Sequence, residues 1–239
     1  WKEISKKCKE KNISFACTPF SIGSLRELID IGVDILKIGS GESFSSPDLI
    51  DECFKSKLPL LISTGMASDI EIEEIKKRIK KTKSFAGIMQ CTSMYPTPLE
   101  KVGLNVLEEY KKSKIPAGLS DHSGSTTPSL FCIAKGYDFL EVHVCFDKRM
   151  FGPDIKASLT LEDLSRVVNF RNELNLINEN PVNKNEIYNE MKEMRNLFGR
   201  SIALKVSQKK GHIIRKEDIL MKKPGSGLSY EFLDKVLNR

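Results

Sequence analysis

Short runs of strand-forming residues alternate with amphipathic helical stretches along the first three quarters of the chain. Strand alternating with helix predicts parallel pairing of the strands through right-handed crossovers. The interval between successive strands, on the order of 20–30 residues, suits a barrel of β/α units. Six strands are predicted, at residues 13–18, 34–39, 60–64, 85–91, 115–120 and 139–144.

Helical patterns occupy the intervals between these strands. Several begin with capping residues, such as Ser46 before Pro47 and Ser68 before Asp69. A closed (β/α)8 barrel needs eight strands, so a count of six predicts that the first two β/α units are absent from this chain. The predicted helices are residues 24–30, 47–55, 70–81, 104–112, 127–135 and 161–174.

The pattern changes after about residue 174. Residues 175–185 are rich in Asn and include Pro181, which indicates a linker, and 186–197 form a helical pattern. From Arg200 the sequence favours strands, at 201–206 and 219–221. We therefore predict three parts: a partial α/β barrel at 1–174, a linker with a short helix at 175–199, and part of a small β-rich domain at 200–239.

Composition excludes several classes of protein. The net charge is +6, but Glu-rich stretches interrupt the Lys residues. The chain has no basic stripe interleaved with aromatic residues, so nucleic-acid binding is not expected. No apolar run approaches the ~20 residues that span a bilayer, so no membrane is expected. The six cysteines form no C-x-x-C pair, which favours reduced core residues of a cytoplasmic protein.

Polar side chains gather where the predicted strands end. In a β/α barrel the carboxyl ends of the strands share one face, called the mouth here, and active sites lie there. One such residue means little, because Ser and Thr are common in turns, but six consecutive strands follow the pattern. The residues are Thr18, Lys37, Ser40, Glu42, Ser63, Thr64, Thr92, Ser93, Tyr95, Ser120, Asp121, His122 and His143.

One set of these side chains suits an anion. Lys37 supplies a positive charge, and neighbouring glycines allow backbone amides to approach a ligand closely. Together they predict a phosphate site at the mouth. The alternative for Lys37 is a lysine that only extends along the barrel wall to solvent. The hydroxyl donors would be Thr18, Ser40, Ser63 and Ser120.

Two of the three histidines suit a metal ion. His122 and His143 end neighbouring strands, whereas His212 follows a turn glycine and is expected at the surface. Two imidazoles with open coordination positions favour Mn²⁺, or Mg²⁺ in its place, and are too few for structural zinc. Each histidine taken singly is as compatible with an ordinary hydrogen-bonded polar residue.

A predicted loop at residues 146–158 follows the last strand. Gly152-Pro153 favours a turn that presents Asp154. The carboxylate of Asp154 is suited to binding sugar hydroxyls, and capping of the turn explains it equally well.

These residues lie in strings that resemble the sialic acid synthase (N-acetylneuraminate synthase) family over nearly the whole chain. The region from residue 201 onward, SIALKVSQKKGHIIRKEDILMKKPGSG, resembles the antifreeze-like (SAF) domain of that family. The other strings are CTPFS, KIGSGE, LISTGMAS, CTSMYPTPLEKVGLN, GLSDHSG and EVHVCFDKRMFGPD.

The resemblance implies a (β/α)8 barrel followed by a SAF domain, with both ends of the chain truncated here. It implies a domain-swapped homodimer in which each SAF domain covers the partner's barrel mouth. It places Thr18, Lys37, Ser40, Ser63 and Ser120 on phosphoenolpyruvate, His122 and His143 on Mn²⁺, and Glu42, Ser93, Tyr95 and Asp154 at or near the amino-sugar pocket. Lys37, Glu42 and Asp154 are the implied catalytic residues, and Lys223 an implied substrate-binding residue.

The implied reaction condenses phosphoenolpyruvate with an N-acylated amino-hexose. The product is a nonulosonic acid, and phosphate is released. The sugar stays open: N-acetylmannosamine would give sialic acid, and a 2,4-diacetamido-trideoxy hexose would give legionaminic or pseudaminic acid.

The chain departs from the family in two ways. The family's first two strands, which carry a Glu and a Lys that serve the reaction, are absent. Lys223 stands where many members have an Arg that reaches the N-acyl group, and Lys lacks the planar fork of Arg. Because an open barrel exposes strand edges, we expect the isolated chain to be inactive and poorly stable.

Two alternatives remain at this stage. One is another phosphoenolpyruvate-condensing 3-deoxy-ulosonate synthase, whose sugar substrates are phosphorylated. The other is a non-catalytic remnant, or a carbohydrate-binding barrel.

Overall fold

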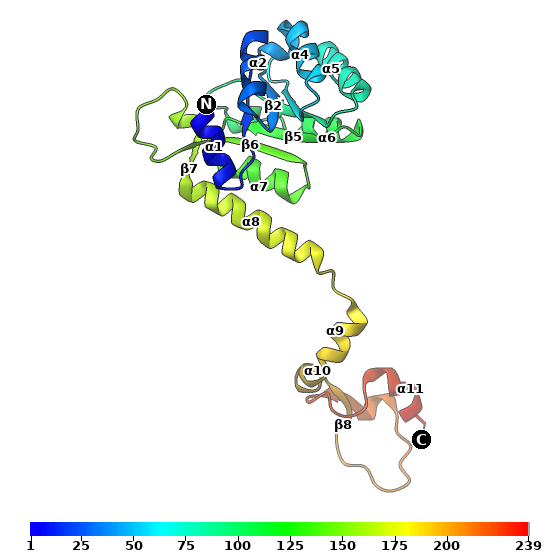
Figure 1. Cartoon of the computed structure of the whole chain (residues 1–239). Coiled ribbons are helices and arrows are strands. Elements are labelled where there is room, and N and C mark those ends of the chain that lie inside the picture. Colours follow the sequence, from blue (N-terminus) through cyan, green and yellow to red (C-terminus); the bar gives the residue numbers. More distant parts are fainter. Residues whose placement is uncertain (239) are drawn as a thin grey trace. The chain divides into compact units, whose positions relative to one another are not determined.

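The structure, a computed structural model, describes residues 1–238 and divides the chain into two compact units. The first unit is Trp1–Leu176 and the second is Ile177–Arg239. Each unit has its own sheet (Figure 1). No helix among the described residues is both long and apolar enough to cross a membrane.

Parallel strands in sequential order form the sheet of the first unit. Its two end strands, β1 and β7, do not pair with each other within residues 1–238, so the sheet is open. All six predicted strands are present. The seven strands are β1 (Ala16–Cys17), β2 (Ile35–Ile38), β3 (Leu60–Ser63), β4 (Ala86–Cys91), β5 (Ala117–Asp121), β6 (Phe139–Cys145) and β7 (Ser158–Thr160).

The strand β7 corrects the prediction of six strands. It lies at the end of the segment predicted to be a loop, and it pairs with β6 through His143 opposite Ser158. Three residues are too few to show the alternation by which a strand is recognised in a sequence. The part of that segment before it contains the short 3₁₀ helix η2 (Ile155–Ala157).

Helices connect most of the strands, and their starts follow the capping chemistry of the sequence. At the start of α5, Ser68 and Glu71 form a capping box in which the Ser68 backbone N–H donates to Glu71 Oε2 at 2.7 Å. Pro47 begins α4, where its missing N–H costs nothing. The helices are α1 (Lys2–Glu10), α2 (Ile22–Ile31), α3 (Glu42–Ser45), α4 (Pro47–Lys55), α5 (Asp69–Lys81), α6 (Leu104–Lys112), α7 (Thr126–Ala134) and α8 (Leu161–Glu179).

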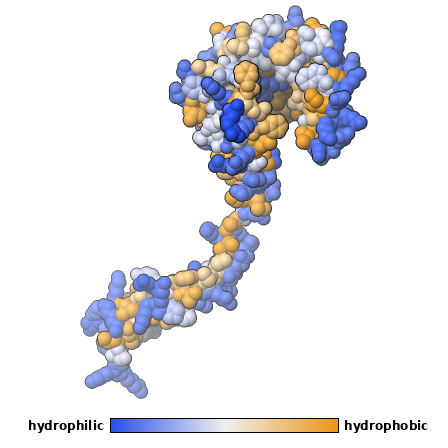
Figure 2. Space-filling model, turned by 90° about the vertical axis from the view of Figure 1, so that its left-hand side faces the viewer, coloured by the Kyte–Doolittle hydropathy of each residue, from blue (hydrophilic) through white to orange (hydrophobic). Residues whose placement is uncertain are grey.

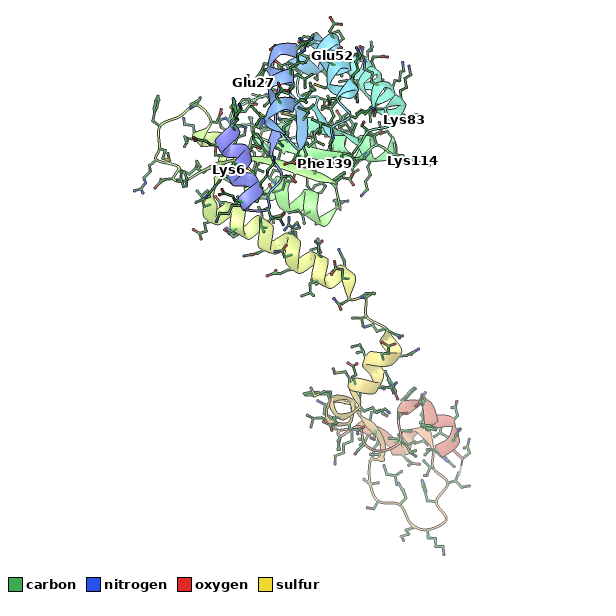
Figure 3. The ribbon with its side chains drawn as sticks, in the orientation of Figure 1. Lys6, Glu27, Glu52, Lys83, Lys114 and Phe139 are labelled. Atoms are coloured by element: carbon green, nitrogen blue, oxygen red, sulfur yellow. The ribbon has the colours of Figure 1, made fainter. Side chains whose placement is uncertain are left out.

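The core of the first unit lies between the sheet and its helices. β4 and β5 are buried along their whole lengths, as expected for parallel strands covered on both faces. Charged side chains such as Glu52, Lys83 and Lys114 lie at the periphery (Figure 3). Six apolar core side chains have no exposed surface at all: Leu36, Ile38, Cys53, Ile62, Ile88 and Leu107.

Glycine is required at position 118 of β5 by close packing against β6. A methyl group on Gly118 would overlap the Phe139 carbonyl and lie 2.5 Å from the Phe139 Cβ. We predict that Gly118→Ala lowers the free energy of unfolding by about 1–3 kcal/mol, the usual cost of overpacking. Gly23→Ala is the matched control: its methyl would meet only Ser21 Oγ, at 3.7 Å. That helical change should stabilise by about 0.5–1 kcal/mol, so equal melting of both variants would contradict this packing.

All six cysteines are free thiols in the structure. Burial raises the pKa of Cys53 and that of Cys132 to about 12, so both stay protonated at neutral pH. Because the thiolate is the reactive form, we predict that a thiol-specific reagent labels neither residue in the native chain. Cys8 and Cys17, which are partly exposed, should react first. Mass spectrometry of peptides labelled before and after denaturation measures this, and native labelling of Cys53 would contradict it.

The helix α8 is longer than predicted and overlaps the predicted linker. The prediction ended the helix at residue 174, but α8 continues to Glu179. Leu176 and Ile177 prolong the apolar helical spacing beyond that point, and the Asn-rich stretch becomes irregular only afterwards.

The second unit contains two short helices and an antiparallel strand pair. The predicted single helix at 186–197 is instead α9 (Lys184–Glu190) and α10 (Lys192–Phe198), separated at Met191. The strand β8 (Ser201–Leu204) pairs with β9 (Ile219–Lys222) in the register Ser201 opposite Lys222. The remaining elements are the 3₁₀ turns at Lys216–Asp218 and Tyr230–Phe232 and the helix α11 (Leu233–Val236).

Candidate active site

Parallel pairing brings the predicted polar residues to one face of the first unit. Register aligns Ser120, the last but one residue of β5, with Glu141, the third residue of β6, so both lie at the same height in the sheet. Lys37 lies on β2 and Ser63 ends β3. The carboxyl ends of these strands therefore form a continuous polar edge, as the sequence predicted for the mouth.

An ion pair lies within this edge. Lys37 Nζ is 2.5 Å from Glu141 Oε1, and Ser120 Oγ donates to the same oxygen at 2.8 Å. The Lys37 side chain is 21 % exposed and that of Glu141 33 %. The ammonium group is thus held at the strand ends instead of extending along the wall to bulk solvent.

His122 follows β5 and is 4 % exposed. Its Nδ1 lies 3.1 Å from the carbonyl oxygen of Thr92. Its Nε2 lies 3.4 Å from the Tyr95 hydroxyl and 3.5 Å from Ser120 Oγ, both long contacts. Burial lowers the pKa of His122, which favours the neutral imidazole.

His143 faces His122 from the neighbouring strand β6. The two ring centroids are 5.1 Å apart. Burial, and next the positive charge that His122 can carry, lower the pKa of His143. Asp154 Oδ2 lies 3.9 Å from His143 Nδ1, and the Tyr95 ring stacks on His122 with centroids 4.2 Å apart.

Hydroxyl groups surround Gly65 beside this pair of histidines. The Gly65 backbone N–H donates to Ser40 Oγ at 3.1 Å. A methyl group on Gly65 would lie 2.5 Å from Ser93 Oγ, 2.8 Å from Ser40 Oγ and 3.0 Å from Cys91 Sγ. The hydroxyls of Ser63 and Ser93 are buried and have no hydrogen-bond partner. Such groups are rare in folded proteins, so these two are available for a ligand.

The remaining predicted residues occupy other positions. The Glu42 carboxylate lies against Gly39: a methyl group added to Gly39 would be 2.6 Å from Glu42 Oε2. The same methyl group would lie close to the side-chain methyl of Thr18. Neither Glu42 nor Thr18 has a hydrogen bond to the Lys37–Glu141 pair in the described part of the chain. Lys223 belongs to the second unit, where its ammonium lies 5.5 Å from the centroid of the Phe198 ring. Its predicted role in binding substrate stays a prediction.

The two histidines fit a divalent metal ion that the sequence predicts. Within residues 1–238, no three His, Cys, Asp or Glu side chains converge as a complete protein cage. An ion here would therefore depend on His122 and His143 with water or substrate oxygens. Lowered pKa values keep both rings able to coordinate, and metal-binding histidines ordinarily donate their other N–H to a carbonyl, as Nδ1 of His122 can to Thr92.

Residues 1–181 match the NeuB family, which is three quarters of the chain. The chain belongs to the NeuB family. It is 32 % identical over its whole length to N,N'-diacetyllegionaminic acid synthase of Campylobacter jejuni and covers 73 % of that protein. It is also 32 % identical, over 95 % of its length, to the enzyme of that name from Legionella pneumophila, of which it covers 64 %.

A solved structure supports the same membership. The N-acetylneuraminic acid (sialic acid) synthetase of Leptospira borgpetersenii matches with a TM-score of 0.70 and 30 % sequence identity. The match covers 82 % of this chain and 70 % of that one. The family resemblance predicted from the strings is thereby confirmed. The relatives named here are nonulosonic acid synthases.

One residue of this NeuB-family site was missed by the sequence analysis. Glu141 holds both Lys37 and Ser120, yet no role was predicted for it. A signal was present: residues two apart on a strand point to the same face, so a functional His143 implies that Glu141 faces the same side. Thr92 was singled out among the polar strand-end residues, and it contacts His122 through its backbone carbonyl, a main-chain contact that residue types do not reveal.

Proposed function

We propose that the mouth of the first unit binds phosphoenolpyruvate and condenses it with the open-chain aldehyde of an N-acylated amino-hexose, giving a nonulosonic acid and phosphate. One observation carries the proposal: an ammonium group and unpartnered hydroxyls lie at the same strand edge as two facing neutral imidazoles, in a chain of the NeuB family. The named relatives are synthases of such acids.

The anionic substrate would be held by Lys37 and the hydroxyls near Gly65. The Lys37 ammonium supplies charge, and Ser63 and Ser93 can donate hydrogen bonds that they make to no protein group. Because these donors are already fixed in place, they stabilise the departing phosphate without reorganising. Ser40, which accepts from the Gly65 N–H, and Ser120, which donates to Glu141 beside Lys37, would complete the set.

His122 and His143 would hold Mn²⁺, or Mg²⁺ in its place. When bound, the ion supplies a Lewis acid that polarises the sugar aldehyde. The Tyr95 ring, stacked on His122, shields one side of the imidazole from water. Asp154, 3.9 Å from His143, is placed to accept hydrogen bonds from sugar hydroxyls, and Glu42 is the other carboxylate for which we propose a role on the sugar.

The proposed chemistry balances without any further reagent. Carbon 3 of phosphoenolpyruvate forms a bond to the aldehyde carbon, and the aldehyde oxygen becomes a hydroxyl. Water adds to carbon 2, and the bond from carbon 2 to the phosphate oxygen breaks. Holding both substrates at one edge supplies much of the rate, because a bimolecular encounter becomes an oriented reaction within one complex.

The mouth also has a surface that fits a protein partner. Exposed apolar side chains lie on the segments that follow five of the strands, and Figure 2 shows apolar residues in orange beside a hollow in the first unit. We propose that a second copy of the chain covers this rim with its second unit, an antifreeze-like domain, in a cytoplasmic homodimer. The side chains are Phe20, Phe44, Met66, Met94, Phe146 and Phe151.

The test is an assay of the full-length gene product with phosphoenolpyruvate, Mn²⁺ and a panel of sugars. The panel contains N-acetylmannosamine, 2,4-diacetamido-trideoxy hexoses and phosphorylated aldoses. Phosphate release that depends on a free N-acylated amino-hexose supports the proposal. Turnover with phosphorylated aldoses alone would assign the protein to the other phosphoenolpyruvate-condensing class. Sugar binding without any turnover would leave a carbohydrate-binding barrel.

A further inference from the structure

We propose that Thr97 is a positioning residue that determines which ring nitrogen of His122 carries the hydrogen. Thr97 does so through its hydroxyl, which holds the backbone carbonyl of Thr92 against the imidazole. The inference rests on the proposed function in one respect only, namely that the unprotonated nitrogen of His122 binds a metal ion. The arrangement of protons is a property of the metal-free chain itself.

The Thr92 carbonyl dictates where His122 carries its hydrogen. Its oxygen lies 3.1 Å from His122 Nδ1, and a carbonyl oxygen can only accept a hydrogen bond. Nδ1 must therefore be the protonated nitrogen of the neutral ring. Nε2 is then left with a free lone pair. The Tyr95 hydroxyl at 3.4 Å can adapt to either state, and Ser120 Oγ, which donates to Glu141, makes only a long contact with Nε2 at 3.5 Å.

A competing contact makes this carbonyl necessary. The thiol of Cys91 lies 3.7 Å from the same Nδ1 atom. A thiol is a weak donor as well as a weak acceptor, so it is compatible with a hydrogen on either ring nitrogen. Without the Thr92 carbonyl, no described group in contact with His122 would exclude the tautomer that carries its hydrogen on Nε2.

Thr97 holds that carbonyl through its hydroxyl. Its Oγ1 lies 3.0 Å from the Thr92 carbonyl oxygen and 2.8 Å from that of Met94. Its backbone N–H donates to the His122 carbonyl at 2.9 Å. Thr97 is 4 % exposed, and these three bonds tie it twice to its own segment after β4 and once to His122. Loss of the hydroxyl removes two of these restraints and leaves the third.

Nitrogen-15 NMR of the metal-free chain labelled on histidine tests the proposal. Two-bond correlations report the protonated ring nitrogen, and the three histidines are assigned with single His→Gln variants. We expect wild-type His122 to carry its hydrogen on Nδ1. Thr97→Val should convert this to a mixture of tautomers, and Thr97→Ser, which keeps the hydroxyl, should retain the wild-type pattern. A wild-type signal from the Nε2–H form would overturn the proposal without any variant.

Thr64→Val is the matched control. Thr64 is also 4 % exposed, and its Oγ1 contacts the Met89 carbonyl at 3.0 Å and the Tyr110 hydroxyl at 2.8 Å. Its loss should lower stability without changing the His122 tautomer. If Thr97→Val leaves His122 unchanged, or if Thr97→Ser behaves like Thr97→Val, the hydroxyl does not have this role.

Metal affinity provides a second readout. If His122 Nε2 binds Mn²⁺, Thr97→Val should weaken binding about 10- to 100-fold, as loss of a group that orients a metal ligand ordinarily does, and Thr97→Ser should restore it. Failure of the Thr97 proposal and failure of the proposed metal site give different results. An Nδ1–H tautomer that depends on Thr97, in a chain that binds no Mn²⁺, would refute the metal site and leave the positioning role intact.

Discussion

His122→Gln should abolish high-affinity Mn²⁺ binding and reduce condensation by more than about 100-fold. This expectation follows from a comparison. Removing a group that only orients a metal ligand lowers metal affinity or activity about 10- to 100-fold, so removing the ligand itself must lower them more. Glutamine keeps a similar size at this buried position, so the fold should persist. Electron paramagnetic resonance of free Mn²⁺ measures the binding, and phosphate release by the full-length protein measures the turnover.

His212→Gln is the matched control for this change. His212 lies in the second unit, where its Nε2 contacts Asp218 Oδ2 at 2.8 Å. Its loss should leave both Mn²⁺ affinity and turnover within the error of the measurement. Equal losses from His122→Gln and His212→Gln would contradict a metal site at the strand edge.

Lys37→Met should lower the rate of condensation about 10²- to 10³-fold. This is the usual loss when one preorganised hydrogen-bond donor that stabilises charge in the transition state is removed. Binding of phosphoenolpyruvate should weaken, because Lys37 is the cation paired at the mouth. Lys55→Met is the control, since Lys55 forms an exposed surface pair with Glu52. Such pairs contribute only about 0–1 kcal/mol, so substrate binding should not change. Calorimetric titration with phosphoenolpyruvate distinguishes the two variants.

A second variant separates function from stability at Lys37. Lys37→Met leaves the Glu141 carboxylate with Ser120 as its hydrogen-bond donor and no cation. Lys37→Met/Glu141→Gln removes the unpaired charge, so it should regain melting temperature. Turnover should stay low, because the ammonium is still missing. Recovery of turnover together with stability would mean that Lys37 has only a structural role.

The elements that carry the site were predictable because their signals are local. β6 begins at Phe139 as predicted, and α4 and α6 have the predicted bounds, because caps, turns and apolar periods lie within each segment. β7 and the division between α9 and α10 were missed. A three-residue strand shows no period, and the break at Met191 has no Pro or Gly to mark it.

The site was predictable as a set of residue types and less so as a network. Placing His122 and His143 on neighbouring strand ends required only the order of the strands. The bond from Lys37 to Glu141 joins residues 104 positions apart, and it depends on register across the curved sheet. The contacts of His122 with the Thr92 carbonyl were beyond reach, since main-chain atoms leave no trace in the residue types.

Anomalous diffraction at the manganese absorption edge, from crystals of the chain grown with Mn²⁺, tests the central claim most directly. The account predicts one strong peak bonded to His122 Nε2 and to the ring of His143, on the same side of the sheet edge as Lys37. A peak elsewhere, or no peak at these two histidines at saturating Mn²⁺, would contradict it.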